Sequence, residues 1–365
     1  MNSFIIERDK IRSNAEEIFS RAGDATVIAV VKGRAYGFGI AEFVPLLHEC
    51  GVRFFGVTDV ADALEIKKLA LPETDIIMLR STALCDELSS LIQNDIIITI
   101  GSTEAAVNAN SIALEKGTTA RAHVKIDTGM GRYGFSPDDT EQIYSVYTKF
   151  SNISVSGLFT HLSSAFKNGN TTKKQLEKLS SVEDELSSRG VSCGTIHFAN
   201  SSYLFKRKKP VGDAVRIGSA FTGRLPCKAH SNGLSRVGHL EGNICEIHWL
   251  PKGSKVGYSG AYTAKQPTRA AVVPIGYSDG FCVEKCRDTY RFKDGIFYIL
   301  SDIKRTLFKK SVYVSVNGYK SKVLGHIGMT HTVCDVTDIP CEIGDNVLFD
   351  INPVYVSPDV YKEYI

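Results

Sequence analysis

The chain has no long apolar run, and its N-terminal segment turns charged directly after Phe4-Ile5-Ile6. A helix that crosses a membrane needs about 20 mostly apolar residues, so the sequence predicts neither a membrane span nor a signal peptide. Net charge is also low, because 43 basic and 40 acidic residues leave only +3. We therefore expect no membrane and no nucleic acid as partners. The one basic run, Lys206-Arg207-Lys208-Lys209, contains no aromatic residue, and we expect a solvated loop there rather than a localisation signal or a phosphate site.

Cysteine spacing of the kind that binds metals is lacking. The nine cysteines form no repeated Cys-x-x-Cys pattern, and Cys282 and Cys286 have no pair of histidines at zinc spacing. We expect no metal site. The cysteines are expected to be reduced packing residues of a cytoplasmic protein.

A chain of 365 residues exceeds the usual single-domain range, so two domains are the first expectation. Short apolar segments alternate with amphipathic helical segments over most of the first 220 residues, as at 41–50, 61–69, 104–116 and 173–189. The alternation predicts a (β/α)₈ barrel, since a doubly wound sheet would show Gly-x-Gly-x-x-Gly after its first strand and none is present. Eight strands are expected, at 26–31, 53–58, 75–79, 95–100, 122–127, 154–161, 195–200 and 214–220.

The periodicity changes after about residue 225, where short β-rich segments follow one another without helices between them. Examples are 269–276, 312–316 and 319–325, the last two joined by the hairpin signal Asn317-Gly318. The fold class is therefore α/β, with an N-terminal barrel at 9–225 and a C-terminal mainly-β domain at 226–365. Residues 1–8 are a candidate addition to the second domain, and 282–311 form an excursion from it.

A strongly apolar strand stops at Lys32, and glycines follow at 33, 37 and 39. A lysine held in an apolar setting can carry a neutral amine that attacks a carbonyl, although most lysines at strand ends are solvated charges. A functional role for Lys32 is favoured because the other unusual residues also lie at strand ends, where the active sites of barrels are built. These residues are the loop 127–132, His161, Asn200, Ser201, Arg216, Gly218 and Ser219.

Seven segments resemble, in order along the chain, the motifs of the alanine racemase family. They are 30–37, 125–134, 160–161, 199–201, 215–218, 256–258 and 274–280. The resemblance implies a barrel and a β-domain, pyridoxal 5'-phosphate as cofactor, and a head-to-tail homodimer in which the β-domain of each subunit completes the other's site. It also implies racemisation of a free small amino acid, either L-alanine to D-alanine or serine.

The resemblance assigns the two proton-transferring bases. Lys32 would bind the cofactor's aldehyde and later act on one face of the substrate Cα, while Tyr258 of the partner subunit would act on the opposite face. A tyrosine pKa near 10 must fall by roughly three units for that role, and Arg216 and His161 are the candidates to lower it.

The remaining site residues are also implied by the resemblance. Arg216 would face the pyridine nitrogen, and because arginine does not give up its proton, that nitrogen would stay unprotonated and racemisation would win over transamination. Lys125 matches a lysine that is carbamylated in many relatives, and a plain ammonium is the open alternative. The other cofactor-binding residues would be Tyr36, His161, Asn200, Ser201, Gly218, Ser219 and Tyr355, and the substrate-binding residues Arg132, Met329 and Tyr277.

Departures from the family pattern leave the substrate open. Thr330 stands where the family usually has aspartate, and His326 and Gly328 also differ, which fits serine or a larger amino acid as well as alanine. One rival is a decarboxylase of related fold, which would place a carboxylate where Arg216 stands. The other is a cofactor-binding protein without turnover, which would lack the β-domain that carries Tyr258.

Overall fold

The computed structural model describes residues 2–166, 169–206, 211–225, 233–287, 291–307 and 311–365. Residues 207–209 of the basic run lie outside this set, so the expectation of a solvated loop stays a prediction. Two compact units are present: Glu7–Val237, and Gly238–Ile365 together with the N-terminal strand β1 (Ser3–Ile6).

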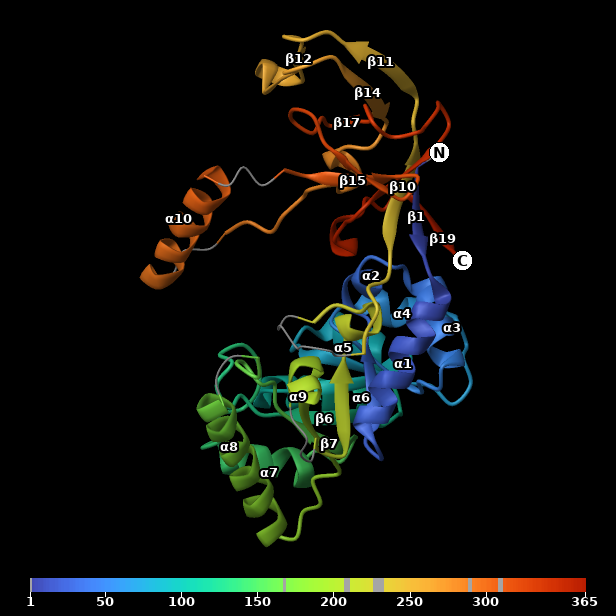
Figure 1. Ribbon diagram of the computed structural model, residues 1–365. Helices are drawn as coiled ribbons and strands as arrows, with labels where there is room; N and C mark the ends of the chain where they lie inside the picture. Colours follow the sequence, from blue (N-terminus) through green and yellow to red (C-terminus); the bar gives the residue numbers. More distant parts are fainter. Residues whose placement is uncertain (1, 167–168, 207–210, 226–232, 288–290, 308–310) are drawn as a thin grey trace. The chain divides into compact units, whose positions relative to one another are not determined.

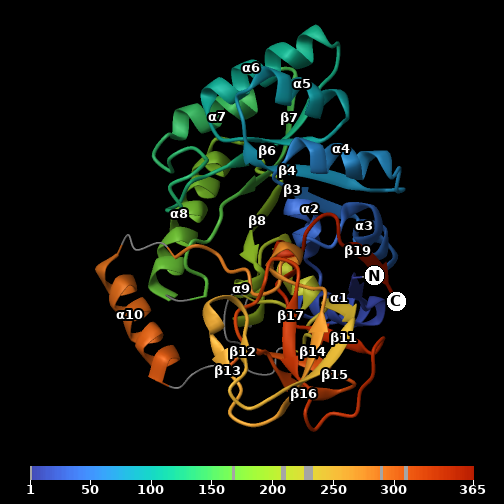
Figure 2. The same cartoon turned by 90° about the horizontal axis from the view of Figure 1, so that it is seen from above.

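The first unit is a closed parallel barrel of eight strands, which confirms the predicted fold class (Figures 1 and 2). The apolar β-branched composition of these strands suits burial on both faces, and Ile28, Ile77, Ile97 and Ala214 pack together in the interior. Five predicted strands end one to three residues earlier than expected, among them those that end at Phe159 and Ile217. The strands are β2 (Thr26–Val30), β3 (Phe54–Val57), β4 (Asp75–Ser81), β5 (Ile97–Ile100), β6 (Ala120–Lys125), β7 (Ile153–Phe159), β8 (Thr195–Asn200) and β9 (Ala214–Ile217).

Helices lie outside the strands (Figure 2), and α4 and α6 begin at residues whose side chains cap them. Asp59 accepts a hydrogen bond from the Ala61 N–H at the start of α4, and Ser102 accepts one from the Ala105 N–H at the start of α6. The helices are α1 (Arg8–Ala22), α3 (Ile40–Glu49), α4 (Val60–Lys68), α5 (Cys85–Gln93), α6 (Thr103–Glu115), α7 (Thr140–Thr148), α8 (Gly169–Ser188) and α9 (Ser201–Lys206).

The second unit is mainly β, as expected. Its six-stranded sheet has the order β16-β15-β18-β10-β1-β19, and β1 lies between an antiparallel and a parallel neighbour. Asn317 and Gly318 both have positive φ, which forms the hairpin that their sequence predicts. The other strands of this sheet are β10 (His239–Asn243), β15 (Tyr313–Val316), β16 (Tyr319–Lys322), β18 (Asn346–Phe349) and β19 (Tyr361–Tyr364). A three-stranded sheet contains β11 (Glu246–Leu250), β14 (Thr268–Val273) and β17 (Thr332–Asp335), and a ribbon pairs β12 (Lys255–Val256) with β13 (Tyr262–Thr263).

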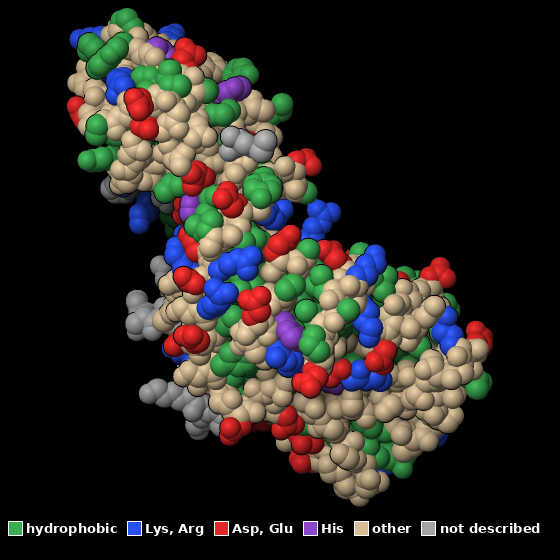
Figure 3. Space-filling view, turned by 90° about the vertical axis from the view of Figure 1, so that its right-hand side faces the viewer, with side chains coloured by type: hydrophobic (Ala, Val, Ile, Leu, Met, Phe, Trp, Pro, Cys, Tyr) green, Lys and Arg blue, Asp and Glu red, His purple; other side chains and the backbone are tan. Residues whose placement is uncertain are grey.

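The excursion at 282–311 contains a helix, α10 (Phe292–Leu307). Its polar side is held by ion pairs from Arg287 to Asp302 at 2.6 Å and from Arg305 to Glu284 at 3.9 Å. Neither α10 nor any other helix in the described part of the chain is long and apolar enough to cross a membrane. On the face drawn in Figure 3, basic and acidic side chains are interspersed, as the near balance of charges in the sequence leads one to expect.

Candidate active site

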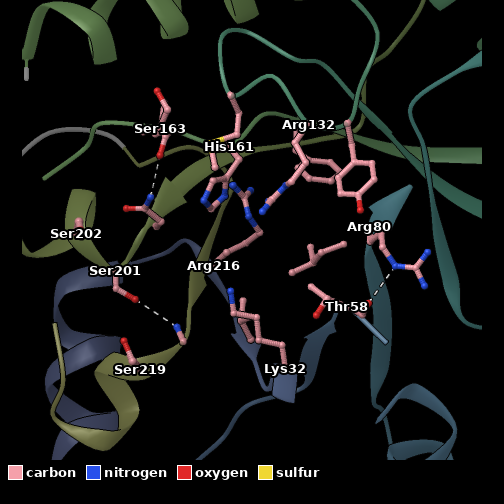
Figure 4. A pocket seen from close by; sticks show the side chains of 18 of the residues that line it. Lys32, Thr58, Arg80, Arg132, His161, Ser163, Ser201, Ser202, Arg216 and Ser219 are labelled. Atoms are coloured by element: carbon pink, nitrogen blue, oxygen red, sulfur yellow. Dashed lines mark hydrogen bonds between the residues drawn. The ribbon is translucent and has the colours of Figure 1, made fainter. Parts of the chain in front are cut away.

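A pocket of about 630 Å³ opens at the carboxyl ends of the barrel strands (Figure 4). Its lining brings together most of the residues singled out in the sequence: Lys32, Tyr36, Lys125, Arg132, His161, Asn200, Ser201, Arg216, Gly218 and Ser219. Four others, Tyr258, Tyr277, Met329 and Tyr355, belong to the β unit instead. Tyr258 lies there in the short helix η2 (Tyr258–Gly260), where it is 80% exposed.

The segment after β2, labelled α2 (Lys32–Tyr36), has an unusual backbone. Gly33, Arg34, Ala35 and Tyr36 all have φ between 53° and 62°, so the backbone makes one left-handed turn. That conformation costs about 1–2 kcal/mol for each residue with a Cβ, and strain of this kind collects at functional sites. Burial, and secondarily the charge of Arg132, lowers the pKa of Lys32. A neutral, nucleophilic amine is therefore reached at lower pH here than on a fully solvated lysine.

Neutral donors gather beside Lys32. The Gly218 N–H donates to Ser201 Oγ at 3.2 Å, and a Cβ at Gly218 would collide with the Tyr36 hydroxyl. Burial raises the pKa of Tyr36 to about 12, so it stays a neutral hydroxyl. With Ser219 at the start of η1 (Ser219–Thr222), these groups form a cradle of hydroxyl and N–H groups. Such a cradle binds a phosphate without needing a cation against it.

Arg216 is buried and held by the barrel itself. Its Nη2 donates to the Thr160 carbonyl at 2.6 Å, and its Nη1 donates to the carbonyl and to Nδ1 of His197 at 2.9 and 2.7 Å. Arginine can only donate, so His197 Nδ1 must accept and its proton must lie on Nε2. Nε2 then donates to His123 Nδ1 at 2.9 Å. Burial lowers the pKa of both histidines, to about 4 for His123. Both rings are therefore uncharged, and Arg216 carries the charge in this chain of hydrogen bonds.

His123 and His197 were not singled out from the sequence. Both are polar residues inside otherwise apolar strands, β6 and β8, and that placement is the signal that could have identified them. The Phe159 ring stacks on His197 at 4.5 Å. Gly157 on β7 leaves room for the pair, because a Cβ there would lie 2.7 Å from the His123 ring.

The charge in the pocket is of one sign. None of the described residues that line it is Asp or Glu, whereas five are basic: Lys32, Arg80, Lys125, Arg132 and Arg216. Arg80 donates two hydrogen bonds of 2.9 Å to the carboxylate of Glu87, which does not line the pocket and balances the charge of Arg80. The Asp127 carboxylate faces away into the N–H groups of its own loop, residues 129–132. The arrangement suits a ligand with several negative charges.

Burial and the basic surroundings lower the pKa of two further groups. Burial, and then Arg216 and Arg132, lowers the pKa of Lys125 to about 8. Burial and Arg216 lower the pKa of His161 to about 3. His161 therefore carries no charge at neutral pH, and of the two groups expected to lower the pKa of a nearby tyrosine, only Arg216 can do so as a cation.

Comparison with known proteins gives one family. The model of the alanine racemase N-terminal domain matches residues 6–226, and that of the alanine racemase C-terminal domain matches residues 237–353. Alanine racemase of Methylacidiphilum infernorum is 30% identical over 323 residues, covering 88% of this chain and 76% of that protein. Alanine racemase 1 of Clostridium acetobutylicum is 29% identical over 350 residues, covering 94% and 84%.

Solved structures agree with the sequence comparisons. Alanine racemase of Clostridium difficile 630 has a TM-score of 0.87 at 26% identity, covering 100% of this chain and 95% of that one. Alanine racemase of Bartonella henselae with covalently bound pyridoxal phosphate has a TM-score of 0.82 at 23% identity, covering 100% and 99%, which is a likeness of fold.

Proposed function

The chain belongs to the alanine racemase family, and from this premise we propose that it is a pyridoxal-phosphate-dependent racemase of a free small amino acid, alanine first. One observation of the pocket supports this most strongly. A lysine with a lowered pKa lies beside a phosphate-type cradle and a buried arginine, without any carboxylate in the described lining.

The residues present fit the cofactor at each of its functional groups. The Lys32 amine suits an aldehyde, because burial favours its neutral form. Tyr36, Ser201, Gly218 and Ser219 suit a phosphate. Arg216 would face the pyridine nitrogen, held there through His197. His161 and Asn200 line the same pocket, and Tyr355 of the β unit is a further proposed phosphate contact.

When bound, the cofactor supplies an electron-withdrawing ring that makes the Cα proton of the amino acid acidic. Lys32 then takes or returns that proton on one face of Cα. Tyr258 of the partner subunit does the same on the other face, which gives inversion. The exposed phenol of Tyr258 supports this role, since it is available to a second subunit. Arg216 keeps its own protons and so leaves the ring nitrogen unprotonated, which favours return of the proton to Cα.

Arg132 binds the substrate carboxylate, and Met329 and Tyr277 of the β unit contribute from the partner. Lys125 supports Arg132 either as an ammonium or as a carbamate. A pKa near 8 leaves an appreciable neutral fraction that can react with carbon dioxide. A homodimer follows from the shared site. A cytoplasmic location is supported by the described cysteines, which are free thiols.

Serine or a larger amino acid is the second candidate substrate. Thr330 Oγ1 lies 2.9 Å from His331 Nδ1, so a neutral hydroxyl stands where the family usually has a carboxylate. The decarboxylase alternative is disfavoured by Arg216, whose buried neighbours leave no carboxylate for the ring nitrogen.

The test is a screen of L- and D-alanine and serine with the cofactor-loaded enzyme in deuterated water. Loss of optical rotation together with deuterium at Cα supports the proposal. Release of carbon dioxide from amino acids would replace it with decarboxylation, and cofactor binding without exchange at Cα would replace it with a binding protein.

A further inference from the structure

Helix α8 carries a glutamine, Gln175, whose side chain is only 2% exposed. Burial of an amide is costly unless its hydrogen-bonding groups find partners, and here all four do. Its Oε1 accepts from the N–H and the hydroxyl of Ser163 at 2.9 and 3.1 Å. Its Nε2 donates to the Thr128 hydroxyl at 3.1 Å and to the His161 carbonyl at 3.2 Å. One side chain therefore joins α8 to the segments that follow β6 and β7.

The backbone partners fix the orientation of the amide. The Ser163 N–H can only donate, so it must face the oxygen of Gln175. The His161 carbonyl can only accept, so it must face the nitrogen. Exchanging the oxygen and the nitrogen would break both bonds at once. A side chain at this position must therefore offer an acceptor and a donor together, as an amide does.

The hydroxyl partners form a chain with one direction. Thr160 Oγ1 donates to the Ile126 carbonyl at 2.8 Å and lies 2.7 Å from Thr128 Oγ1. Because the Thr160 proton is used on that carbonyl, Thr128 must donate to Thr160 and accept from Gln175. Both threonines are at most 3% exposed. Buried networks in which each donor has an acceptor make their surroundings rigid.

The segments joined in this way carry residues of the pocket. Thr128 belongs to the loop 127–132, which ends at Arg132, the residue proposed to bind the substrate carboxylate. His161 and Ser163 lie in the segment after β7, and with Arg132 they line the pocket (Figure 4). Movement of one segment against the other would move Arg132 relative to His161.

The loop shapes itself but is connected to its neighbour by Gln175. The Asp127 carboxylate accepts from the N–H groups of residues 129–132, so these bonds stay within the loop. The loop backbone also packs on the amide, because a Cβ at Gly129 would lie 3.8 Å from Gln175 Nε2. Asp127 thus accounts for the form of the loop, and Gln175 accounts for its attachment to the segment after β7.

We propose that Gln175 is a positioning residue: its buried amide connects the loop 127–132 to the segment 161–163 and so holds Arg132 at the pocket. The effect on substrate binding rests on the proposed function, whereas the effect on the two segments does not. The phosphate cradle of Ser201, Gly218 and Ser219 is built by other parts of the chain. Cofactor binding should therefore depend little on Gln175.

The experiment compares the wild-type full chain with Gln175→Met, Thr128→Val and the double variant. Gln142→Met, at an exposed glutamine of α7, is the matched control. Amide-resolved hydrogen–deuterium exchange is measured first. Gln175→Met should speed exchange at Ser163 by roughly tenfold or more, because its N–H loses its acceptor. Thr128→Val keeps that acceptor and, like Gln142→Met, should leave Ser163 within about threefold of the wild type.

The second readout is the racemisation of alanine by the cofactor-loaded enzyme. Gln175→Met should raise KM by roughly tenfold or more, with kcat within about threefold, because Arg132 binds the carboxylate throughout the reaction. The affinity for pyridoxal phosphate, titrated by its absorbance, should also stay within about threefold. The double variant should raise KM by less than the product of the two single effects, because both substitutions remove the bond between Gln175 and Thr128.

Three outcomes would overturn the assignment of Gln175. The first is Ser163 exchange in Gln175→Met equal to that in the wild type or in Gln142→Met. The second is an unchanged KM, or a loss of cofactor affinity as large as the rise in KM, which would indicate a general structural role. The third needs no variant and applies even if Gln175→Met fails to fold: a wild-type Ser163 amide that exchanges as freely as an open loop.

Failure of the proposed function would be seen separately. Wild-type protein that binds no pyridoxal phosphate, or racemises neither alanine nor serine, would contradict the proposed function. The exchange of the Ser163 amide would still decide whether Gln175 connects the two segments. Protection of that amide in the wild type, lost in Gln175→Met and kept in Thr128→Val, is the expected result.

Discussion

At the scale of single residues, the described lining of the pocket combines a group of basic side chains with no carboxylate. Arg216 has no acidic partner in the described lining, so its protons go to carbonyls and to a neutral histidine. Lys32, Lys125 and His161 all have lowered pKa values for the same reason, burial with cations nearby.

The lowered pKa of Lys32 gives a pH prediction with a definite sign. Only the neutral amine attacks an aldehyde, so covalent incorporation of pyridoxal phosphate should speed up as pH rises and reach its plateau below the ordinary lysine pKa of 10.5. Arg132→Met removes a cation that lowers this pKa, and the plateau should move to higher pH. The measurement is the rate of incorporation against pH by absorbance. A plateau that does not move would contradict the electrostatic role of Arg132.

His197 offers a second prediction. His197→Leu removes the ring acceptor of Arg216, and kcat for racemisation should fall by roughly 10- to 100-fold, as is usual when a supporting hydrogen-bond partner is lost. The absorbance band of the bound cofactor should shift as well, which a purely structural defect would not produce. His248→Leu, on the exposed side of the β unit, is the control. Unchanged kcat and an unchanged spectrum in His197→Leu would show that Arg216 does not depend on the histidine.

At the scale of elements, β1 links the start of the chain to the β unit. It pairs with β10 on one side and β19 on the other, and Phe4 is fully buried against Gly238, where a Cβ would collide with the phenyl ring. An edge strand could fray without consequence, but this one lies inside a sheet.

Phe4→Ala should therefore destabilise the protein by about 3–5 kcal/mol, the cost of removing a buried phenyl group and leaving a cavity. Trp249→Ala is the matched control, since Trp249 is 60% exposed and its loss should change stability by about 0.5 kcal/mol or less. Denaturant unfolding followed by circular dichroism measures both. Equal effects of the two variants would mean that β1 contributes little to the sheet.

At the scale of the whole molecule, the proposed active site contains Lys32 and Tyr258 from different subunits. Neither Lys32→Ala nor Tyr258→Phe should racemise alanine appreciably. A mixture refolded together should recover roughly a quarter of wild-type activity, because half of the dimers are hybrids and each hybrid has one intact site of two. No recovery, with dimers present by ultracentrifugation, would contradict a shared site.

Much of this architecture could be predicted because its signals are local. Each barrel strand is a short apolar run between amphipathic segments, and all eight expected strands are found, with boundary differences of a few residues. Lys32 and the glycines that follow it lie close together in the chain, so their motif can be recognised from the sequence alone. The helix α10 was missed although its apolar residues recur at helical spacing, and in the structure those residues stay exposed.

The sequence by itself determined the strand order of the barrel and the residues that its strand ends present, since hydrophobic periodicity reports burial along one element. Only the tertiary structure decided that Arg216, His197 and His123 form one chain of hydrogen bonds. Those contacts join different strands, with His123 and His197 separated by 74 positions in the chain. Closure of the barrel brings them together, and the missing Cβ of Gly157 leaves the space in which the two rings meet.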